Sequence, residues 1–165
     1  MHSVGEVVVR LAADGLLVVG IGNPLRGDDA AGLLLGQALA AKLGVRYLQV
    51  EDVPENYLAE LRLTEAKNIL LVDAADMQAP AGTIRIVEPR RLSEVSLSTH
   101  KSSLRLLCDM LADAHGKQVL LLGVQPATLE WGEPISAPVA QAVNAFVDGM
   151  SAFRVMAEDE VRDRS

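Results

Sequence analysis

An apolar run that ends in glycines, directly before an apolar helical pattern, constrains this chain more than any other feature. The run covers residues 16–22 (LLVVGIG), and an uninterrupted apolar stretch of this length is typical of a strand buried on both faces. Residues 28–43 form a helical pattern that ends at Gly44, a residue suited to terminating a helix. Open α/β sheets keep their sites beyond the carboxyl ends of strands. A site is therefore predicted where Asp28 and Asp29 follow the glycine turn.

Strands and helices continue to alternate along the rest of the chain. The pattern predicts strands at 45–50, 68–72, 83–87 and 118–123, and helices at 54–65, 102–114 and 137–155. Residues 83–87 (TIRIV) alternate between polar and apolar, which indicates an edge strand with one solvated face. Alternating strands and helices favour a mostly parallel sheet with helices on both faces. The fold class predicted is a three-layer α/β sandwich.

The length and composition are those of one domain. A chain of 165 residues is long enough for one core and short for two. We expect a single domain over 1–165 with its core at about 16–155 and a peripheral arm (1–14) and charged tail (156–165). Residues 4–13 suit either a helix or a strand, and His2 is expected to be disordered.

The net charge indicates which binding partners are expected, and the cysteine content indicates the cellular compartment. The net charge of −7 repels phosphate backbones and anionic lipids, so neither nucleic acid nor a membrane is expected as a partner. The single cysteine, Cys108, fits a reducing compartment. It lies on an apolar helical stripe, which indicates a core residue rather than a nucleophile. With no targeting pattern near the N-terminus, we expect a cytoplasmic protein. The sequence is compatible with a monomer and does not define the oligomeric state.

Three polar residues are candidates for a functional site. Asp29 follows the first strand, Asp73 follows the strand at 68–72, and His100 lies just before a helix. If the strands are parallel neighbours, the three side chains converge at one edge of the sheet. Two carboxylates and an imidazole suit zinc, nickel, manganese or iron(II).

Each of these residues also has a purely structural interpretation. A carboxylate such as Asp29 or Asp28 is stabilised at a helix N-terminus by the helix dipole. Asp73 suits a solvated loop, and His100 suits a capping segment. The predicted convergence favours the site, with Asp29 as the ligand and Asp28 as the helix-end carboxylate.

Other common motifs are missing from the sequence. The Gly20-x-Gly22 pair lacks the third glycine of a dinucleotide fingerprint, so the two glycines are interpreted as permitting a turn and close backbone approach. No phosphate loop is present, and no Gly-x-Ser-x-Gly elbow supports a hydrolase of the serine type.

The motifs together resemble those of the nickel-iron hydrogenase maturation proteases, nearest to the branch that serves formate-hydrogenlyase-type hydrogenases. The first three similar segments, in order, are residues 20–29 (GIGNPLRGDD), 72–76 (VDAAD) and 98–100 (STH). Further similar segments are residues 54–57 (PENY), 80–85 (PAGTIR) and 122–126 (LGVQP). The resemblance covers about residues 16–150.

The resemblance implies an endopeptidase that removes a C-terminal extension from the large-subunit precursor of a nickel-iron hydrogenase after nickel insertion. The family's metal-binding residues correspond to Asp29, Asp73 and His100, and the nickel is carried by the precursor. The implied fold is a twisted five-stranded sheet between helices with one antiparallel strand, for which residues 83–87 are the candidate. Either the metal or an aspartic dyad formed by the two aspartates is the expected chemistry.

One segment departs from the family pattern. Many members have an aspartate followed by glycines before the PENY-like stretch, whereas residues 49–53 here read QVEDV. The acidic, flexible loop is therefore altered, with Glu51 or Asp52 as substitutes for the missing carboxylate. This departure keeps open a non-enzymatic metal-binding or chaperone module on the same scaffold. A peptidyl-tRNA hydrolase-like enzyme shares the Gly-x-Gly-Asn-Pro start, but the acidic charge and the distant His100 disfavour it.

Overall fold

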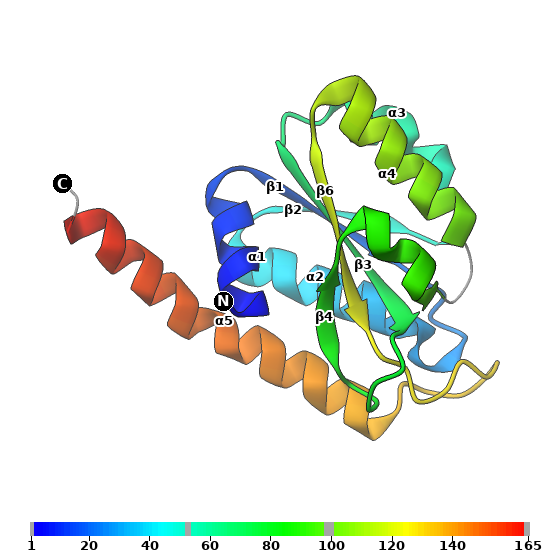
Figure 1. Cartoon of the computed structure of the whole chain (residues 1–165). Helices are drawn as coiled ribbons and strands as arrows, with labels where there is room; N and C mark the ends of the chain where they lie inside the picture. Colours follow the sequence, from blue (N-terminus) through cyan, green and yellow to red (C-terminus); the bar gives the residue numbers. More distant parts are fainter. Residues whose placement is uncertain (1, 52–53, 98–100, 164–165) are drawn as a thin grey trace.

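The computed structural model describes residues 2–51, 54–97 and 101–163, which form a three-layer α/β sandwich around one twisted sheet (Figure 1). The strand order is β2-β1-β3-β6-β4, and β5 pairs separately with β3. The strands are β1 (Leu16–Ile21), β2 (Arg46–Val50), β3 (Asn68–Asp76), β4 (Ile84–Val87), β5 (Ser96–Leu97) and β6 (Gln118–Val124). The fold class predicted from the sequence is confirmed.

The pairing directions also agree with the prediction. β1 is parallel to β2 and β3, and β3 is parallel to β6. β4 is antiparallel to β6 at one edge of the sheet, as expected for the alternating segment 83–87. The two-residue strand β5, antiparallel to β3, was not predicted, because two residues carry no periodicity.

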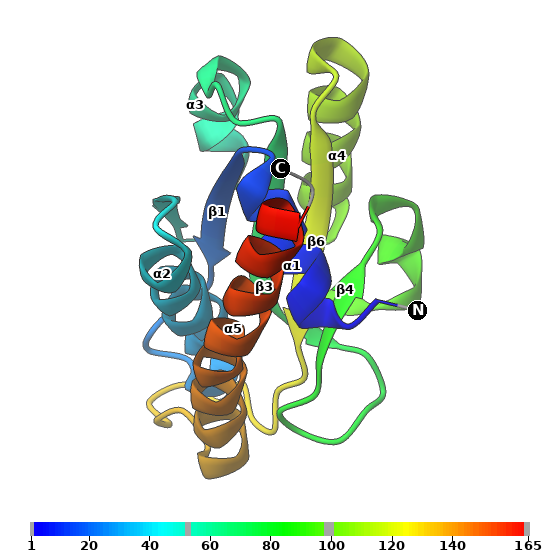
Figure 2. The ribbon, with the colours of Figure 1, turned by 90° about the vertical axis from the view of Figure 1, so that its left-hand side faces the viewer.

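Helices cover both faces of the sheet, with α1, α2 and α5 on one face and α3 and α4 on the other (Figures 1 and 2). The α-helices are α1 (Val4–Ala13), α2 (Ala31–Leu43), α3 (Leu58–Leu63), α4 (Lys101–His115) and α5 (Ala137–Asp163). The short 3-10 helices are η1 (Gly27–Ala30), η2 (Pro54–Tyr57) and η3 (Pro89–Glu94). No helix within the described residues is long and apolar enough to cross a membrane.

The central strands divide the core into two apolar clusters because their side chains alternate between faces. On β3, Leu70 and Val72 pack in the cluster beneath α2 and α5, whereas Ile69 and Leu71 pack in the cluster beneath α3 and α4. This is why β1 and most of β3 are apolar at every position. The predicted stripe on α4 is confirmed by its buried residues, which are Leu104, Leu107, Cys108 and Leu111.

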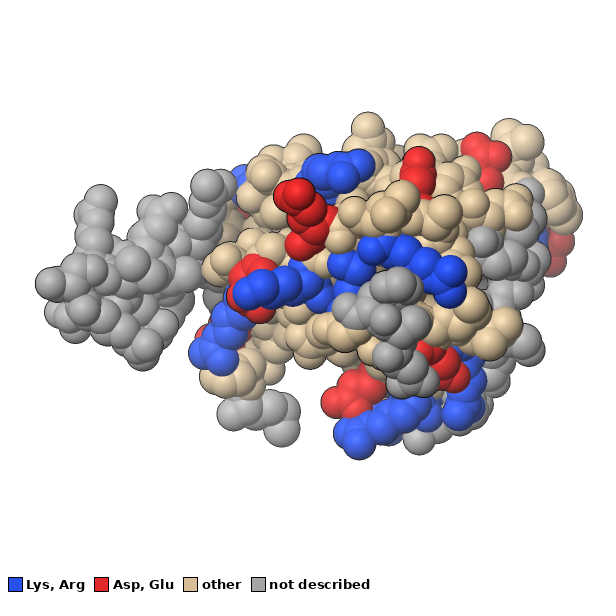
Figure 3. Space-filling model, turned by 90° about the horizontal axis from the view of Figure 1, so that it is seen from above, with Lys and Arg blue, Asp and Glu red and all other residues tan. Residues whose placement is uncertain are grey.

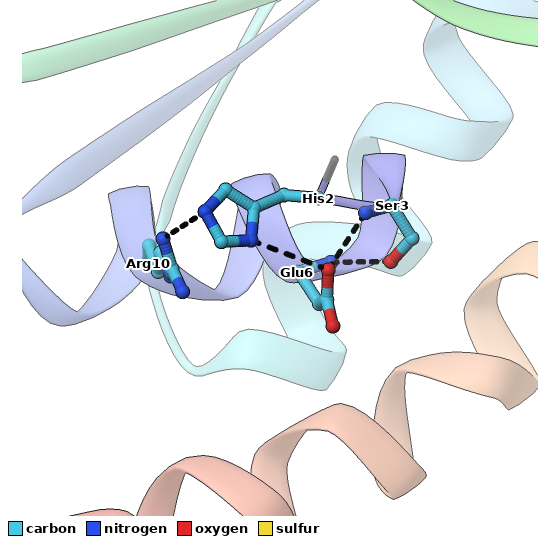
Figure 4. A network of polar contacts seen from close by, with 4 residues as sticks. All are labelled: His2, Ser3, Glu6 and Arg10. Atoms are coloured by element: carbon cyan, nitrogen blue, oxygen red, sulfur yellow. Dashed lines mark hydrogen bonds and ion pairs between the residues drawn. The ribbon is translucent and has the colours of Figure 1, made fainter.

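The N-terminal segment, predicted to be a peripheral arm, contains helix α1, which supplies Val8, Val9 and Leu11 to the core. Ser3 caps the helix in a reciprocal box with Glu6: Glu6 N–H donates to Ser3 Oγ at 3.2 Å, and Ser3 N–H donates to Glu6 Oε2 at 2.7 Å (Figure 4). Such boxes satisfy amides that the first helical turn leaves open. His2, which was expected to be disordered, contacts α1, since its ring lies 2.9 Å from Arg10 Nη1 and 3.7 Å from Glu6 Oε2.

Four predicted elements differ from the observed ones by more than one residue. The helix expected at 54–65 forms the 3-10 helix η2 followed by α3, which ends at Leu63. The helix expected from Asp28 begins as η1, and α2 proper begins at Ala31. β3 continues to Asp76, beyond the predicted end at 72, because it pairs with β6 up to Ala74 and with β5 beyond it. Helix α5 continues to Asp163 through part of the charged tail, and Figure 1 shows this end extending away from the sheet.

Candidate functional site

Asp29 lies just beyond the carboxyl end of β1, on the short helix η1, and is fully buried. Its carboxylate Oδ2 accepts a hydrogen bond of 3.0 Å from the backbone amide of Asn23. Gly22 packs against the backbone of Asp29, since a Cβ on Gly22 would lie 1.9 Å from the Asp29 carbonyl oxygen. The glycine therefore permits the close backbone approach predicted for it and brings η1 back over the end of β1.

Asp73 lies inside β3 rather than at its end, which corrects the predicted position. It is 1% exposed and is in register with Gly123 of β6. β1 pairs with β3 only as far as Val72, so Asp73 is the first residue of β3 beyond its pairing with β1. It occupies the carboxyl edge relative to β1 even though its own strand continues.

A close helix–strand contact brings Asp29 and Asp73 to the same edge. Gly32 is the second residue of α2, and a Cβ on Gly32 would lie 2.2 Å from the Ile21 oxygen and 2.9 Å from Asp73 Cα. Only a residue without a side chain allows the helix to approach both strands this closely. Two buried aspartates, one on η1 just beyond β1 and one on the neighbouring parallel strand β3, thus lie on the side of the sheet where β1 ends.

The third predicted residue, His100, lies outside the described residues, as do Asp52 and Val53 of the altered segment 49–53. The last residue described before this gap is Leu97, which pairs with Ala75 two residues after Asp73. Within the described ranges no group of three or more His, Cys, Asp or Glu side chains is arranged to hold a metal ion. The set of Asp29, Asp73 and His100 therefore stays a prediction.

Asp28 does not act as a helix-end carboxylate, which corrects its sequence interpretation. Its side chain is fully buried and accepts four hydrogen bonds from the loop that follows β6. The donors are Ala127 N at 2.7 Å, Thr128 N at 3.1 Å, Ser136 N at 2.7 Å and Ser136 Oγ at 2.8 Å. Burial raises the pKa of Asp28, but the hydrogen bonds from Ser136, Ala127 and Thr128 outweigh it and leave the pKa below its ordinary value.

Gln125 is a second positioning residue that sequence reasoning missed. It is 7% exposed, and its Oε1 accepts from the amides of Met77 at 2.7 Å and Ala79 at 3.4 Å. Its Nε2 donates to Asp76 Oδ1 at 3.1 Å. Gln125 and Asp28 together hold the loops at the carboxyl edge. The sequence signal for Gln125 was its place in the LGVQP segment, which the resemblance matched without indicating a role.

Comparisons of the sequence and of the fold with known proteins place the chain in a family. The family model described as hydrogenase maturation protease (HycI) matches residues 53–151. A hydrogenase 3 maturation protease of Escherichia coli (strain K12) is 32% identical over 149 residues, which cover 85% of this chain and 95% of that protein. The chain belongs to the hydrogenase maturation protease family.

Further relatives of this family member agree in sequence and in fold. The hydrogenase expression/formation protein HoxM of Cupriavidus necator is 28% identical over 142 residues, covering 81% of this chain and 70% of HoxM. The crystal structure of a hydrogenase 3 maturation protease has a TM-score of 0.68 at 30% identity and covers 83% of this chain and 89% of its own. A maturation protease from Thermococcus kodakarensis KOD1, at 24% identity, shares the fold with a TM-score of 0.75 and covers 89% of this chain and 97% of its own.

Proposed function

We propose that this maturation protease removes a C-terminal extension from the large-subunit precursor of a nickel-iron hydrogenase, in the cytoplasm and after nickel has been inserted. The observation that carries the proposal is the pair of buried carboxylates, Asp29 and Asp73, at one sheet edge of a chain in this family. The same pair suits a non-enzymatic module that binds the precursor's metal, so the decisive test is cleavage.

In the proposed mechanism the nickel already held by the precursor is the recognition element. Asp29 and Asp73 offer negative charge to the occupied metal site, and His100 offers an imidazole nitrogen. An empty precursor site lacks the positive charge, so the difference in affinity provides specificity. The bound metal then polarises the scissile carbonyl or activates a water molecule.

An aspartic dyad is the alternative chemistry at the same two carboxylates, and the pH dependence separates the two. A dyad needs one of Asp29 and Asp73 protonated, so cleavage falls as pH rises and the shared proton is lost. Metal engagement needs both carboxylates ionised, so cleavage falls as pH decreases. A pH profile of single-turnover cleavage at constant precursor loading distinguishes these directions.

The proposal is tested by mixing the purified protein with nickel-loaded and nickel-free precursor and following the precursor mass. We expect shortening of the loaded form alone. Equal shortening of both forms would rule out metal-gated recognition, and binding of the loaded form without shortening would establish the non-enzymatic module instead. Replacement of His100 by alanine is expected to abolish the preference for loaded precursor.

A further inference from the structure

An arginine-lined hollow lies next to the candidate site, between the edge strand β4, the short helix η3 and the end of β3. Its volume is about 430 Å³, and its lining includes Arg85, Arg90 and Arg91 with one acidic residue, Glu88. The whole chain has 22 acidic and 15 basic residues, so three arginines around one hollow depart from its overall balance. Figure 3 shows charged side chains of both signs on the face of the molecule that is seen from above.

The hollow lies on the same face of the sheet as Asp73. Gly123 of β6 is in register with Asp73 on one side and with Arg85 on the other, and residues in register across a sheet point to the same face. The neighbouring residues agree, because Leu71, Leu121 and Val87 all pack in the cluster beneath α3 and α4. Asp73, Gly123 and Arg85 therefore form one row across three strands.

Gly123 and Met77 lie between Asp73 and Arg85, the two ends of this row. Gly123 has no side chain, and a Cβ there would lie 3.1 Å from the sulfur of Met77. Met77 also lines the hollow. The group that lies over Gly123, between Asp73 and Arg85, is therefore the flexible thioether of Met77 and not a charged side chain of β6. Such a side chain adapts readily to an apolar or backbone segment lying over it.

Arg85 is the arginine best placed to receive a ligand. Arg90 is already engaged in an ion pair with Glu88. Arg85 is exposed, and among the described residues its guanidinium makes no ion pair or hydrogen bond. A guanidinium presents a planar fork of donors that matches a carboxylate in two parallel hydrogen bonds.

We propose that this hollow is a subsite for a carboxylate of the polypeptide substrate, bound by Arg85 about three residues from the scissile bond; the inference rests on the proposed function. The spacing follows if the scissile bond lies at Asp73. From Asp73 to Arg85 is two steps between neighbouring strands, or about 10 Å, and an extended chain rises about 3.4 Å per residue. The carboxylate belongs either to an acidic side chain or to the C-terminus of the extension. Both sources present the same chemistry to Arg85.

The subsite is tested with short capped peptides, whose binding is read without cleavage. The probes are N-acetyl-tetra-alanine with a free carboxyl terminus, N-acetyl-Ala-Glu-Ala-amide, and the N-acetyl-Ala-Gln-Ala-amide control. Titrations follow the arginine Nε–Hε NMR signals of the full-length protein. We expect one or both carboxylate peptides to shift the Arg85 signal, the glutamine peptide to leave it unchanged, and added salt to weaken binding. The terminal and side-chain arms identify the source of the carboxylate.

Two arginine variants complete the experiment. Arg85→Gln is expected to weaken binding of the carboxylate peptide about tenfold, as for loss of a charge-assisted hydrogen-bonded pair. The matched control is Arg46→Gln, because Arg46 is also exposed but lies on β2, at the opposite edge of the sheet. Arg85→Lys retains the charge without the fork and is expected to bind with intermediate affinity. Thermal unfolding verifies that each variant is folded.

The experiments distinguish failure of the subsite proposal from failure of the proposed function. Equal weakening by Arg46→Gln, or no preference for carboxylate over glutamine peptides, would show that Arg85 forms no such subsite. In the precursor assay, Arg85→Gln is expected to raise KM and leave kcat unchanged, as for lost uniform binding. If wild-type protein cleaves the loaded precursor and Arg85→Gln has an unchanged KM, the subsite alone fails. If wild-type protein does not cleave, the proposed function fails.

Discussion

The Asp28 carboxylate accepts hydrogen bonds from both the amide and the hydroxyl of Ser136, at 2.7 and 2.8 Å, across 108 residues of chain. With the amides of Ala127 and Thr128, this carboxylate closes the loop after β6 over the glycine turn after β1. Gly27 adds to the closure, since its amide donates to the Glu133 oxygen at 3.1 Å. The turn that carries Asp29 is thus held in place by hydrogen bonds to the loop at 127–136.

Replacing Asp28 by asparagine tests these hydrogen bonds. The variant retains the shape but loses the charge, so all four donors lose their charged acceptor and at least one of them faces the new NH2 group, which is itself a donor. We expect the free energy of unfolding to fall by about 2–3 kcal/mol. Chemical denaturation at neutral pH measures the change. Asp148→Asn, at an exposed position on α5, is the control and is expected to have little effect.

The pH dependence of that difference has a defined sign. The pKa of Asp28 is lowered from 3.8 in the folded protein, so its contribution to stability is complete above the unfolded-state value. It is lost as pH falls below 3.8 and through the folded-state pKa. The stability gap between wild type and Asp28→Asn should therefore be constant near neutral pH and shrink in acid. A gap that widens in acid would contradict the assignment.

Replacing Gly32 by alanine tests the contact that brings α2 to Asp73. The new Cβ would lie 2.2 Å from the Ile21 oxygen and 2.5 Å from the Val72 oxygen. Because both are backbone atoms, helix α2 has to move, and we expect destabilisation of about 2–3 kcal/mol despite the better helix propensity of alanine. Gly149→Ala on α5 is the matched control, since nothing lies within 4 Å of its added Cβ. It should stabilise the protein by up to about 1 kcal/mol.

Replacing either candidate carboxylate tests the catalytic proposal. Asp29→Asn and Asp73→Asn are nearly isosteric and are each expected to lower kcat/KM for nickel-loaded precursor about a hundredfold or more. Single-turnover cleavage followed by mass spectrometry measures the loss, and far-UV circular dichroism verifies the fold. Asp14→Asn, at an exposed residue that pairs with Lys67, should cleave normally. Wild-type rates in both site variants would exclude the pair from the chemistry.

Cys108 is predicted to be inert in the folded protein. It is 2% exposed, and burial, together with the nearby Asp109 charge, raises the pKa of its thiol to about 12. Thiolate is the reactive form, so an alkylating reagent at mildly alkaline pH should label the native protein far more slowly than the denatured one. Cys108→Ala is expected to retain cleavage and to lose about 1 kcal/mol of stability. Loss of cleavage in a folded Cys108→Ala variant would reopen the nucleophile interpretation.

Several parts of the molecule followed from sequence pattern alone. Apolar runs identified the strands around residues 16–22 and 68–72, and the alternating segment 83–87 identified the edge strand, whose antiparallel direction was implied only by the family resemblance. The sequence also indicated that Asp29 and Asp73 lie beside the central strands β1 and β3, and both residues are buried there. These features are local, because a strand's burial and the residue at its end are written in consecutive positions.

Other features were decided only by the tertiary structure, because they depend on contacts between distant segments. No local pattern reveals that Asp28 holds the loop at 127–136, that Gly32 leaves room for two carbonyl oxygens, or that β3 continues past Asp73 by pairing with β5. The row of Asp73, Gly123 and Arg85 likewise exists only in the register of three strands. The sequence by itself determined most of the elements and the placement of Asp29 and Asp73 beside the central strands. Tertiary packing determined which partners the aspartates and the neighbouring arginine meet, because partners far apart in the chain come together only when the sheet is assembled.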